Sequence, residues 1–349
     1  MSTARIPSSP TRVYEIDFFS EALQGDVKCD LQGAMGSIPV HFVNVDSMDM
    51  TPTEFSALVD CLLPKEREKV LRFRKENDQK LSLVSALLQR RTIRESLCCG
   101  DGDYEIMRSK EGKPYPVSST RPVANWNYNV SHHGSFVGIV SDTDHIVGAD
   151  VVELHVRRTW TKDAAAYISM FQSQFTPAEL RCAKGCRSDV ERYRHFFVNW
   201  SLKEAYIKAV GTGLQMDLQA LHFVIYFDNP DSHEETTGGH MRCRGTAHLY
   251  IRGRLRNDWS FVFQELDASH VITVARGPVH DVAPTFGLSA GMSIAAPKEE
   301  EPRPNVLSPP SVTAVTPLTM SIRKLALEDL LTENMARDWR NKSAGGGVE

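Results

Sequence analysis

The segment from Asn199 to Gly213 constrains this chain more than any other. It reads N-W-S-L-K-E-A-Y-I-K-A-V-G-T-G, with good helix formers throughout and no glycine or proline before its last three residues. Glu204 and Lys208 stand four residues apart, so they share one face of the predicted helix, and Lys203 adds a second cation. Such a pair is commonly a surface salt bridge. A carboxylate beside lysines also suits metal-assisted phosphate chemistry, so both interpretations are open from these residues alone.

A carboxylate also lies inside a predicted strand upstream of this helix. Residues 145–152 read H-I-V-G-A-D-V-V and follow a predicted strand at 135–141 after a short polar turn. Asp150 is the acidic residue of this apolar run, where an unpaired charge would be costly. We therefore expect a cation beside Asp150, which is either a side chain or a metal ion.

Two further segments carry polar groups at the ends of short predicted strands. Residues 126–134 read W-N-Y-N-V-S-H-H-G, and residues 108–116 read R-S-K-E-G-K-P-Y-P. A lone histidine is usually structural, but His132 and His133 next to Asn129 and Ser131 favour an anion or nucleotide pocket. The G-K-P sequence predicts an exposed turn and by itself says no more.

Residues 65–94 are locally basic within an acidic chain. They hold ten Lys or Arg residues and four Asp or Glu residues, while apolar residues recur at helical spacing. Most of these cations are expected on a solvated helix face.

These segments together resemble the signatures of the 4′-phosphopantetheinyl transferases. The helix matches the W-x-x-K-E-x-x-x-K block, V-G-A-D at 147–150 matches the Val/Ile-Gly-hydrophobe-Asp block, and N-V-S-H at 129–132 matches a third. Their order, and matches from about residue 63 to residue 275, resemble the long, monomeric type of the family and its eukaryotic members. The resemblance implies an α+β fold made of a pseudo-twofold pair of similar α/β halves, with the active site in the cleft between them.

The resemblance also implies a reaction. The family transfers 4′-phosphopantetheine from coenzyme A to a serine of acyl or peptidyl carrier proteins, with Mg²⁺, and releases adenosine 3′,5′-bisphosphate. By this resemblance Asp150 and Glu204 hold the metal, Glu204 accepts the serine proton, and Lys208 binds phosphate. Some bacterial members carry a third carboxylate where this chain has Val152, so we expect a water or His133 to complete the site.

The resemblance extends to the nucleotide. Cations of the basic region are expected at the 3′-phosphate, and the lysine of the G-K-P loop is expected near a phosphate. The residues expected to bind coenzyme A are Arg74, Lys75, Lys80, Gly112, Lys113, Pro114, Asn129, Ser131, His132, Lys203 and Lys208.

Composition limits the remaining possibilities. The 349 residues are 41% hydrophobic and 24% charged with a net charge of −4, which is ordinary for a soluble globular protein and gives no basic footprint for nucleic acid. No apolar run approaches the length of a membrane span. The seven cysteines are scattered, and Cys182 and Cys186 lack a second pair to complete a zinc site. We expect a monomer in a reducing compartment, the cytosol.

The chain divides into five expected segments. A leader at 1–37 precedes an N-terminal half at 38–144 and a C-terminal half at 145–276. A proline-rich linker at 277–317 leads to a segment at 318–349 with a short strand, a helix and a glycine-rich tail.

Two alternatives to this enzyme stay open. A coenzyme A or carrier-protein binder without catalysis is one, although it would not need Asp150, Glu204 and Lys208 together. An unrelated phosphotransferase is the other, and the chain has neither a P-loop nor a kinase glycine-rich loop.

Overall fold

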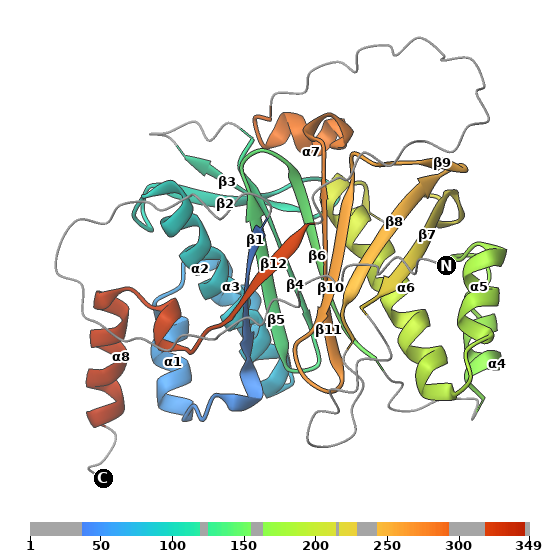
Figure 1. Cartoon of the computed structure of the whole chain (residues 1–349). Helices are drawn as coiled ribbons and strands as arrows, with labels where there is room; N and C mark the ends of the chain where they lie inside the picture. The colour runs from blue at the N-terminus through green and yellow to red at the C-terminus, as the bar shows by residue number, and fades with distance from the viewer. Residues whose placement is uncertain are drawn as a thin grey trace, which may run out of the picture.

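Two β-sheets stand side by side at the centre of the molecule, with helices on the outer face of each (Figure 1). The computed structural model describes residues 37–118, 125–154, 163–213, 216–228, 243–292 and 318–345. The expected leader, except for its last residue, and residues 293–317 of the expected linker lie outside this part of the chain. None of the helices in the described ranges is both long and apolar enough to span a bilayer.

The N-terminal half is built on a four-stranded sheet in the order β12-β1-β5-β4. Its central strand β1 pairs antiparallel with β5 and parallel with β12, a strand from the far C-terminal end of the chain. The strands are β1 (Ser37–Asn44), β4 (Asn127–His133), β5 (Phe136–Asp142) and β12 (Thr319–Lys324). The helices of this half are α1 (Pro52–Asp60), α2 (Pro64–Leu71), α3 (Glu76–Leu97) and α8 (Glu333–Gly345).

The C-terminal half is built on a second sheet in the order β6-β11-β10-β8-β7, with the short β9 paired to β8. Its strands are β6 (Ile146–Glu153), β7 (Leu221–Phe227), β8 (Gly245–Ile251), β9 (Arg254–Leu255), β10 (Ser260–Glu265) and β11 (His270–Gly277). Its helices are α4 (Ala164–Ser169), α5 (Pro177–Lys184), α6 (Asp189–Val210) and α7 (Pro284–Ser289).

The two halves follow the same plan, as the resemblance predicted. In each half the first strand is followed by a 22-residue helix, α3 or α6. The first strand of each half also pairs antiparallel with a later strand, β1 with β5 and β6 with β11. Each long helix lies against its own sheet because one of its faces is apolar and buried. The α+β fold of paired halves is therefore confirmed.

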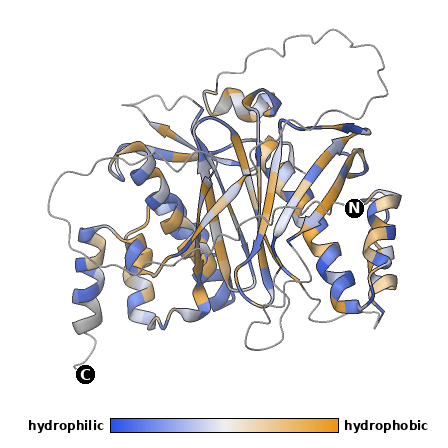
Figure 2. Cartoon of the chain, viewed as in Figure 1, coloured by the Kyte–Doolittle hydropathy of each residue, from blue (hydrophilic) through white to orange (hydrophobic). Residues whose placement is uncertain are grey.

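Hydrophobic residues, coloured orange in Figure 2, occur on the strands and helices of both halves, and the buried ones form clusters that include residues of α3 and α6. One cluster includes Leu83, Leu87 and Leu88 of α3, and another includes Leu202 and Ala205 of α6. A third cluster joins the two sheets and contains residues of β1, β6 and β11. The two sheets thus pack on each other through this third cluster.

Residues 278–292 differ from the expected proline-rich linker. They form a short 3-10 helix, Val279–Asp281, and then α7, which packs on the end of α6. The reason is apolar burial, because Ala283 and Phe286 are buried in the second core cluster. The expected strand and helix of the last segment are present as β12 and α8, and β12 forms the edge of the first sheet.

Candidate active site

Asp150, the buried carboxylate of β6, is paired with a cation, as its burial predicted. Lys208 Nζ lies 2.6 Å from Asp150 Oδ1, and Ser131 Oγ donates to the same oxygen at 3.2 Å. Lys208 Nζ also donates to Ser131 Oγ at 3.0 Å, which closes a triangle of three elements, β4, β6 and α6. The sequence predicted a partner for Asp150 but left its identity open. In this structure it is a side chain of the signature helix.

Gly148 explains why α6 approaches β6 so closely. A Cβ atom at this position would lie 2.0 Å from the carbonyl oxygen of Ala205 and 2.4 Å from the backbone nitrogen of Ala209. Because side chains alternate along a strand, Gly148 and Asp150 point to the same face. The glycine therefore brings the backbone of α6 within reach, and Lys208 meets Asp150.

Glu204 lies one helical turn before Lys208 and is partly buried beside the same pair. Burial raises the pKa of its carboxyl group, the charge of Asp150 raises it further, and Lys208 opposes both effects. Among the described residues its carboxylate has no hydrogen bond or ion pair. A partly buried carboxylate without a partner is set up to bind a cation or a proton.

Asp150 and Glu204 supply the hard oxygen ligands that Mg²⁺ prefers, so the residues present fit this ion. Within the described ranges they are not joined by a third carboxylate, histidine or cysteine to make a closed metal site. Val152, where the resemblance implies a third carboxylate in some members of the family, is buried in the apolar core. A site with two protein ligands leaves positions for water and for substrate phosphate oxygens.

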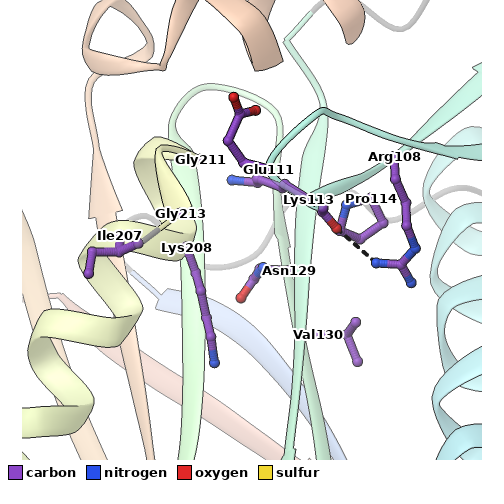
Figure 3. A pocket seen from close by; sticks show the side chains of 11 residues that line it. Arg108, Glu111, Lys113, Pro114, Asn129, Val130, Ile207, Lys208, Gly211 and Gly213 are labelled. Carbon is purple, nitrogen blue, oxygen red and sulfur yellow. Dashed lines mark hydrogen bonds between the residues drawn. The ribbon is translucent and has the colours of Figure 1, made fainter. Parts of the chain in front are cut away.

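A pocket extends from Lys208 to the loop between β2 (Tyr104–Arg108) and β3 (Pro114–Ser118) (Figure 3). Gly112 has a φ of 90°, and this left-handed turn lets its carbonyl oxygen accept a hydrogen bond from Arg108 at 2.8 Å. The pocket is lined by Arg108, Glu111, Gly112, Lys113, Pro114, Asn129, Val130, Ile207, Lys208, Gly211 and Gly213. The expected loop residues and the signature helix are therefore brought together.

Cations from several elements gather near this pocket. Burial lowers the pKa of Lys69, and the nearby charges of Arg108 and Arg72 lower it further. Burial likewise lowers the pKa of His132, followed by the charges of Lys208 and Lys69. Like charges depress one another's pKa only when they are close, so these five groups share one region. The arrangement suits a ligand with several phosphates.

The sequence analysis chose other cations from the same basic region. Lys80 pairs with Glu76 at 2.8 Å on α3, and Arg74 and Lys75 are exposed at its start. None of these three lines the pocket described above. Lys69 and Arg72 were not among the candidates chosen from the sequence. Periodicity places them on a helix face, but it does not show that the fold brings this face close to Arg108.

Alternate residues of β4, among them Asn129 and Ser131 of the N-V-S-H block, hold the two halves together. The side chains of Asn127, Asn129, Ser131 and His133 accept the N–H groups of Val147, Ala149, Val151 and Glu153 at 3.0, 2.8, 3.1 and 3.3 Å. Each contact joins residues 20 apart, so the edge strands of the two sheets run parallel and are bridged by side chains. We name this set of four contacts the seam.

The seam limits what the predicted binding residues on β4 can offer a ligand. Ser131 Oγ donates to Asp150 and accepts from Lys208 and Val151, which uses its full hydrogen-bonding capacity. Asn129 Oδ1 is occupied by Ala149, so its amide NH₂ is the group that faces the pocket. His132 lies on the other side of the strand, near the charges of Lys208 and Lys69.

Lys203 does not lie where the resemblance placed it. It is 1% exposed, and its Nζ donates to the carbonyl oxygens of Leu218 at 2.8 Å and Leu221 at 2.7 Å. It also pairs with Glu179 at 2.9 Å. An ammonium group has three N–H donors, and all three are used here. The geometry leaves no donor for the expected phosphate contact, and Lys203 instead anchors α5 and β7 to α6.

Comparison with known proteins identifies this arrangement. A family model described as "4′-phosphopantetheinyl transferase, N-terminal" matches residues 48–144, and the model of the 4′-phosphopantetheinyl transferase superfamily matches residues 146–275. A phosphopantetheinyl transferase of Thraustochytrium sp. is 30% identical over 218 residues, which cover 61% of this chain and 69% of that protein. The chain belongs to the 4′-phosphopantetheinyl transferase superfamily. The boundary between the two matches falls between β5 and β6, where the two halves meet.

Other relatives of this phosphopantetheinyl transferase carry a more specific name. The L-aminoadipate-semialdehyde dehydrogenase-phosphopantetheinyl transferase of Schizosaccharomyces pombe is 31% identical over 189 residues, covering 50% of this chain and 69% of that protein. The human protein of the same name is 25% identical over 226 residues, covering 64% and 69%. The predicted family and enzyme class are confirmed. The chain is an enzyme that transfers 4′-phosphopantetheine to carrier proteins.

Proposed function

We propose that this enzyme takes the 4′-phosphopantetheine group from coenzyme A in a Mg²⁺-dependent reaction and releases adenosine 3′,5′-bisphosphate. The observation that carries the proposal is the unpartnered Glu204 carboxylate beside the Asp150–Lys208 pair, at one end of a pocket with cations nearby. When bound by Asp150 and Glu204, Mg²⁺ supplies positive charge to the diphosphate oxygens.

The chain's own residues can perform the remaining steps. A carrier serine oxygen forms a bond to the phosphorus that carries the pantetheine arm, and the bond from that phosphorus to the bridging diphosphate oxygen breaks. Glu204 takes the serine proton, directly or through water, and its raised pKa makes it a stronger base than an ordinary glutamate. Lys208 stabilises the negative charge that grows on the departing phosphate.

The nucleotide end of coenzyme A is the part that we expect the cations near the pocket to bind. We propose that Lys69, Arg72 and Arg108, with His132, bind phosphates of coenzyme A, in place of the Arg74, Lys75 and Lys80 set expected from sequence. The support is their electrostatic proximity and the place of Arg108 in the pocket lining. The Asn129 amide NH₂ adds a neutral donor on the same wall.

The names of several relatives suggest one carrier substrate. We propose the carrier domain of an aminoadipate-semialdehyde dehydrogenase as a substrate, because relatives from human and fission yeast are named for that enzyme. We also propose that the enzyme acts as a monomer, as the resemblance implies, and in the cytosol, the reducing compartment that its scattered cysteines favour. Light scattering of the purified protein would check the monomer, and fractionation of cells would check the compartment.

The proposed reaction is tested by mass spectrometry of an apo carrier. Purified enzyme, coenzyme A and Mg²⁺ should raise the carrier mass by one phosphopantetheine, and EDTA should prevent the increase. The released nucleotide should co-elute with adenosine 3′,5′-bisphosphate. If several apo carriers accept the group from a control transferase but not from this enzyme, the proposal fails.

Variants separate the metal role from the phosphate role. Asp150→Ala and Glu204→Gln should each slow turnover roughly 100- to 10,000-fold, the usual effect of losing a general base and our expectation for losing a metal ligand. Raised Mg²⁺ should partly restore Asp150→Ala but not Lys208→Ala. Glu333→Gln, on exposed α8 away from the pocket, is the matched control and should leave turnover unchanged. A folded Glu204→Gln enzyme with near wild-type turnover would show that Glu204 is neither ligand nor base.

A further inference from the structure

Lys113 of the G-K-P loop is a buried lysine that has no anionic partner among the residues that the structure describes. Its side chain is 6% exposed, and its Nζ donates to the carbonyl oxygens of Val147 at 3.1 Å and Ala209 at 2.7 Å. The same nitrogen lies 4.7 Å from the centre of the Phe286 ring, within the range of a cation–π contact. Figure 3 shows the side chain running from the loop toward the end of α6.

These contacts use the hydrogen-bonding capacity of the amine. Of three N–H donors, two meet carbonyl oxygens and the third has the face of an aromatic ring beside it. Burial lowers the pKa of Lys113 to about 7. A group held in this way is directed away from the phosphate contact that the resemblance assigned to it.

The three partners of Lys113 lie on three different parts of the site. Val147 is on β6, three residues before Asp150. Ala209 directly follows Lys208, and its carbonyl belongs to the last turn of α6, where carbonyl oxygens lack partners within the helix. A cation at this end also interacts favourably with the helix dipole. Phe286 is on α7, which covers the end of α6 and also contacts Gly211.

We infer that Lys113 is a positioning residue. It fixes the G-K-P loop to β6 and to the end of α6 and so sets the distance from this loop to Lys208. It acts through the backbone of these elements and does not contact a phosphate. The inference rests on the proposed use of coenzyme A as the donor.

Chemical labelling of the unmodified enzyme tests where the Lys113 amine lies. Acetic anhydride should modify Lys110, an exposed lysine of the same loop, while Lys113 stays unmodified both with and without coenzyme A. Mass spectrometry of the loop peptide distinguishes the two sites. If Lys113 is modified in the free enzyme and coenzyme A suppresses that modification, the amine faces the ligand and the inference is overturned.

Kinetics of Lys113→Met with two donors tests the same point independently. Loss of positioning should lower kcat/KM on the order of 100-fold for coenzyme A and for its 3′-dephospho form alike, since a shift of about 1 Å can cost this much. Both kcat and KM should change, whereas a merely less stable enzyme would lose active molecules without a change in KM. Lys110→Met is the matched control and should behave as wild type.

The outcomes also separate this inference from the proposed function. If wild-type enzyme uses neither donor, the proposed function fails, and the labelling result still decides the position of Lys113. If Lys113→Met loses activity with coenzyme A but not with 3′-dephospho-coenzyme A, Lys113 binds the 3′-phosphate directly and the inference is wrong.

Discussion

At the scale of single residues, the site contains two carboxylates in different electrostatic states. Asp150 is paired with Lys208 and accepts a hydrogen bond from Ser131, so its charge is compensated within the protein. Glu204 is partly buried and lacks such a partner among the described residues, and burial followed by the charge of Asp150 raises its pKa. Of the two, Glu204 is thereby the carboxylate suited to accept a proton, which fits its proposed role as base.

Glu204→Gln should separate stability from catalysis. Because the Glu204 pKa is raised above 4.5 in the folded protein, its contribution to stability is full below that pH and is lost as pH rises through the raised pKa. Glutamine has no proton to lose, so without metal the variant should gain stability relative to wild type between pH 4.5 and 7.5. Denaturant unfolding at these two pH values measures this change, while turnover should be severely reduced. A variant that loses stability relative to wild type across this interval would contradict the raised pKa.

At the scale of elements, the site depends on the contact between β6 and α6. Asp150 and Lys208 meet because Gly148 allows two backbones to approach, and Lys113 bonds both elements just beyond that contact. β11 pairs with β6 along its edge, and the buried Thr273 of β11 lies opposite Asp150 in the register of these two strands. The geometry of the Asp150–Lys208 ion pair is therefore set by backbone packing as well as by side chains.

Gly148→Ala should damage both the fold and the activity. The added Cβ meets backbone atoms of α6, which cannot rotate away, so we expect a loss of about 3 kcal/mol or more of unfolding free energy, at the upper end for overpacked cores. The remaining folded enzyme should turn over slowly because Lys208 is moved from Asp150. Gly102→Ala is the control, since a Cβ there has no neighbour within 4 Å. Denaturant unfolding and carrier labelling measure the two effects, and near wild-type values for Gly148→Ala would contradict this account of the contact.

At the scale of the whole molecule, the two halves are joined at several places. The seam bridges β4 and β6, and Arg276 of β11 reaches across to Asp142 of β5 at 2.7 Å. Burial alone would raise the Asp142 pKa, but hydrogen bonds from His145, from the Asp144 N–H and from Arg276 lower it to about 2. The C-terminal segment adds a strand beside β1 and places Leu325, Leu327 and Leu330 in the first core.

Asp142→Asn should weaken the junction of the halves in a pH-dependent way. The folded pKa of about 2 lies below the ordinary 3.8, so Asp142 stabilises the fold above pH 3.8, and this stability is lost as pH falls toward 2. The shift corresponds to about 2 kcal/mol at pH 7. Asp144→Asn, exposed in the same turn, should have little effect. Unfolding free energies of wild type and Asp142→Asn should differ at pH 7 and converge near pH 2, and a constant difference would contradict the role of this carboxylate.

Much of this protein follows from local sequence. The pattern of W-S-L-K-E-A-Y-I-K predicted the helix that carries Glu204 and Lys208. Two runs on either side of a short polar turn predicted β5 and β6, and an isolated carboxylate in an apolar strand predicted a cation beside Asp150. These features depend on residues close together in the chain, so their physical causes are visible in the sequence.

Only the tertiary structure decided which cations lie close together near the pocket and which are held by other parts of the protein. Lys203 belongs to the signature helix and Lys113 to the G-K-P loop, yet their amines are occupied by carbonyl oxygens of distant segments, Val147 and Leu218 among them. Lys69, in contrast, comes from a basic run without a distinguishing pattern and lies close to Arg108. A lysine side chain is long and has three donors, so its partner depends on which backbone the fold brings near it. That information is absent from local sequence because it is created when the two halves pack together.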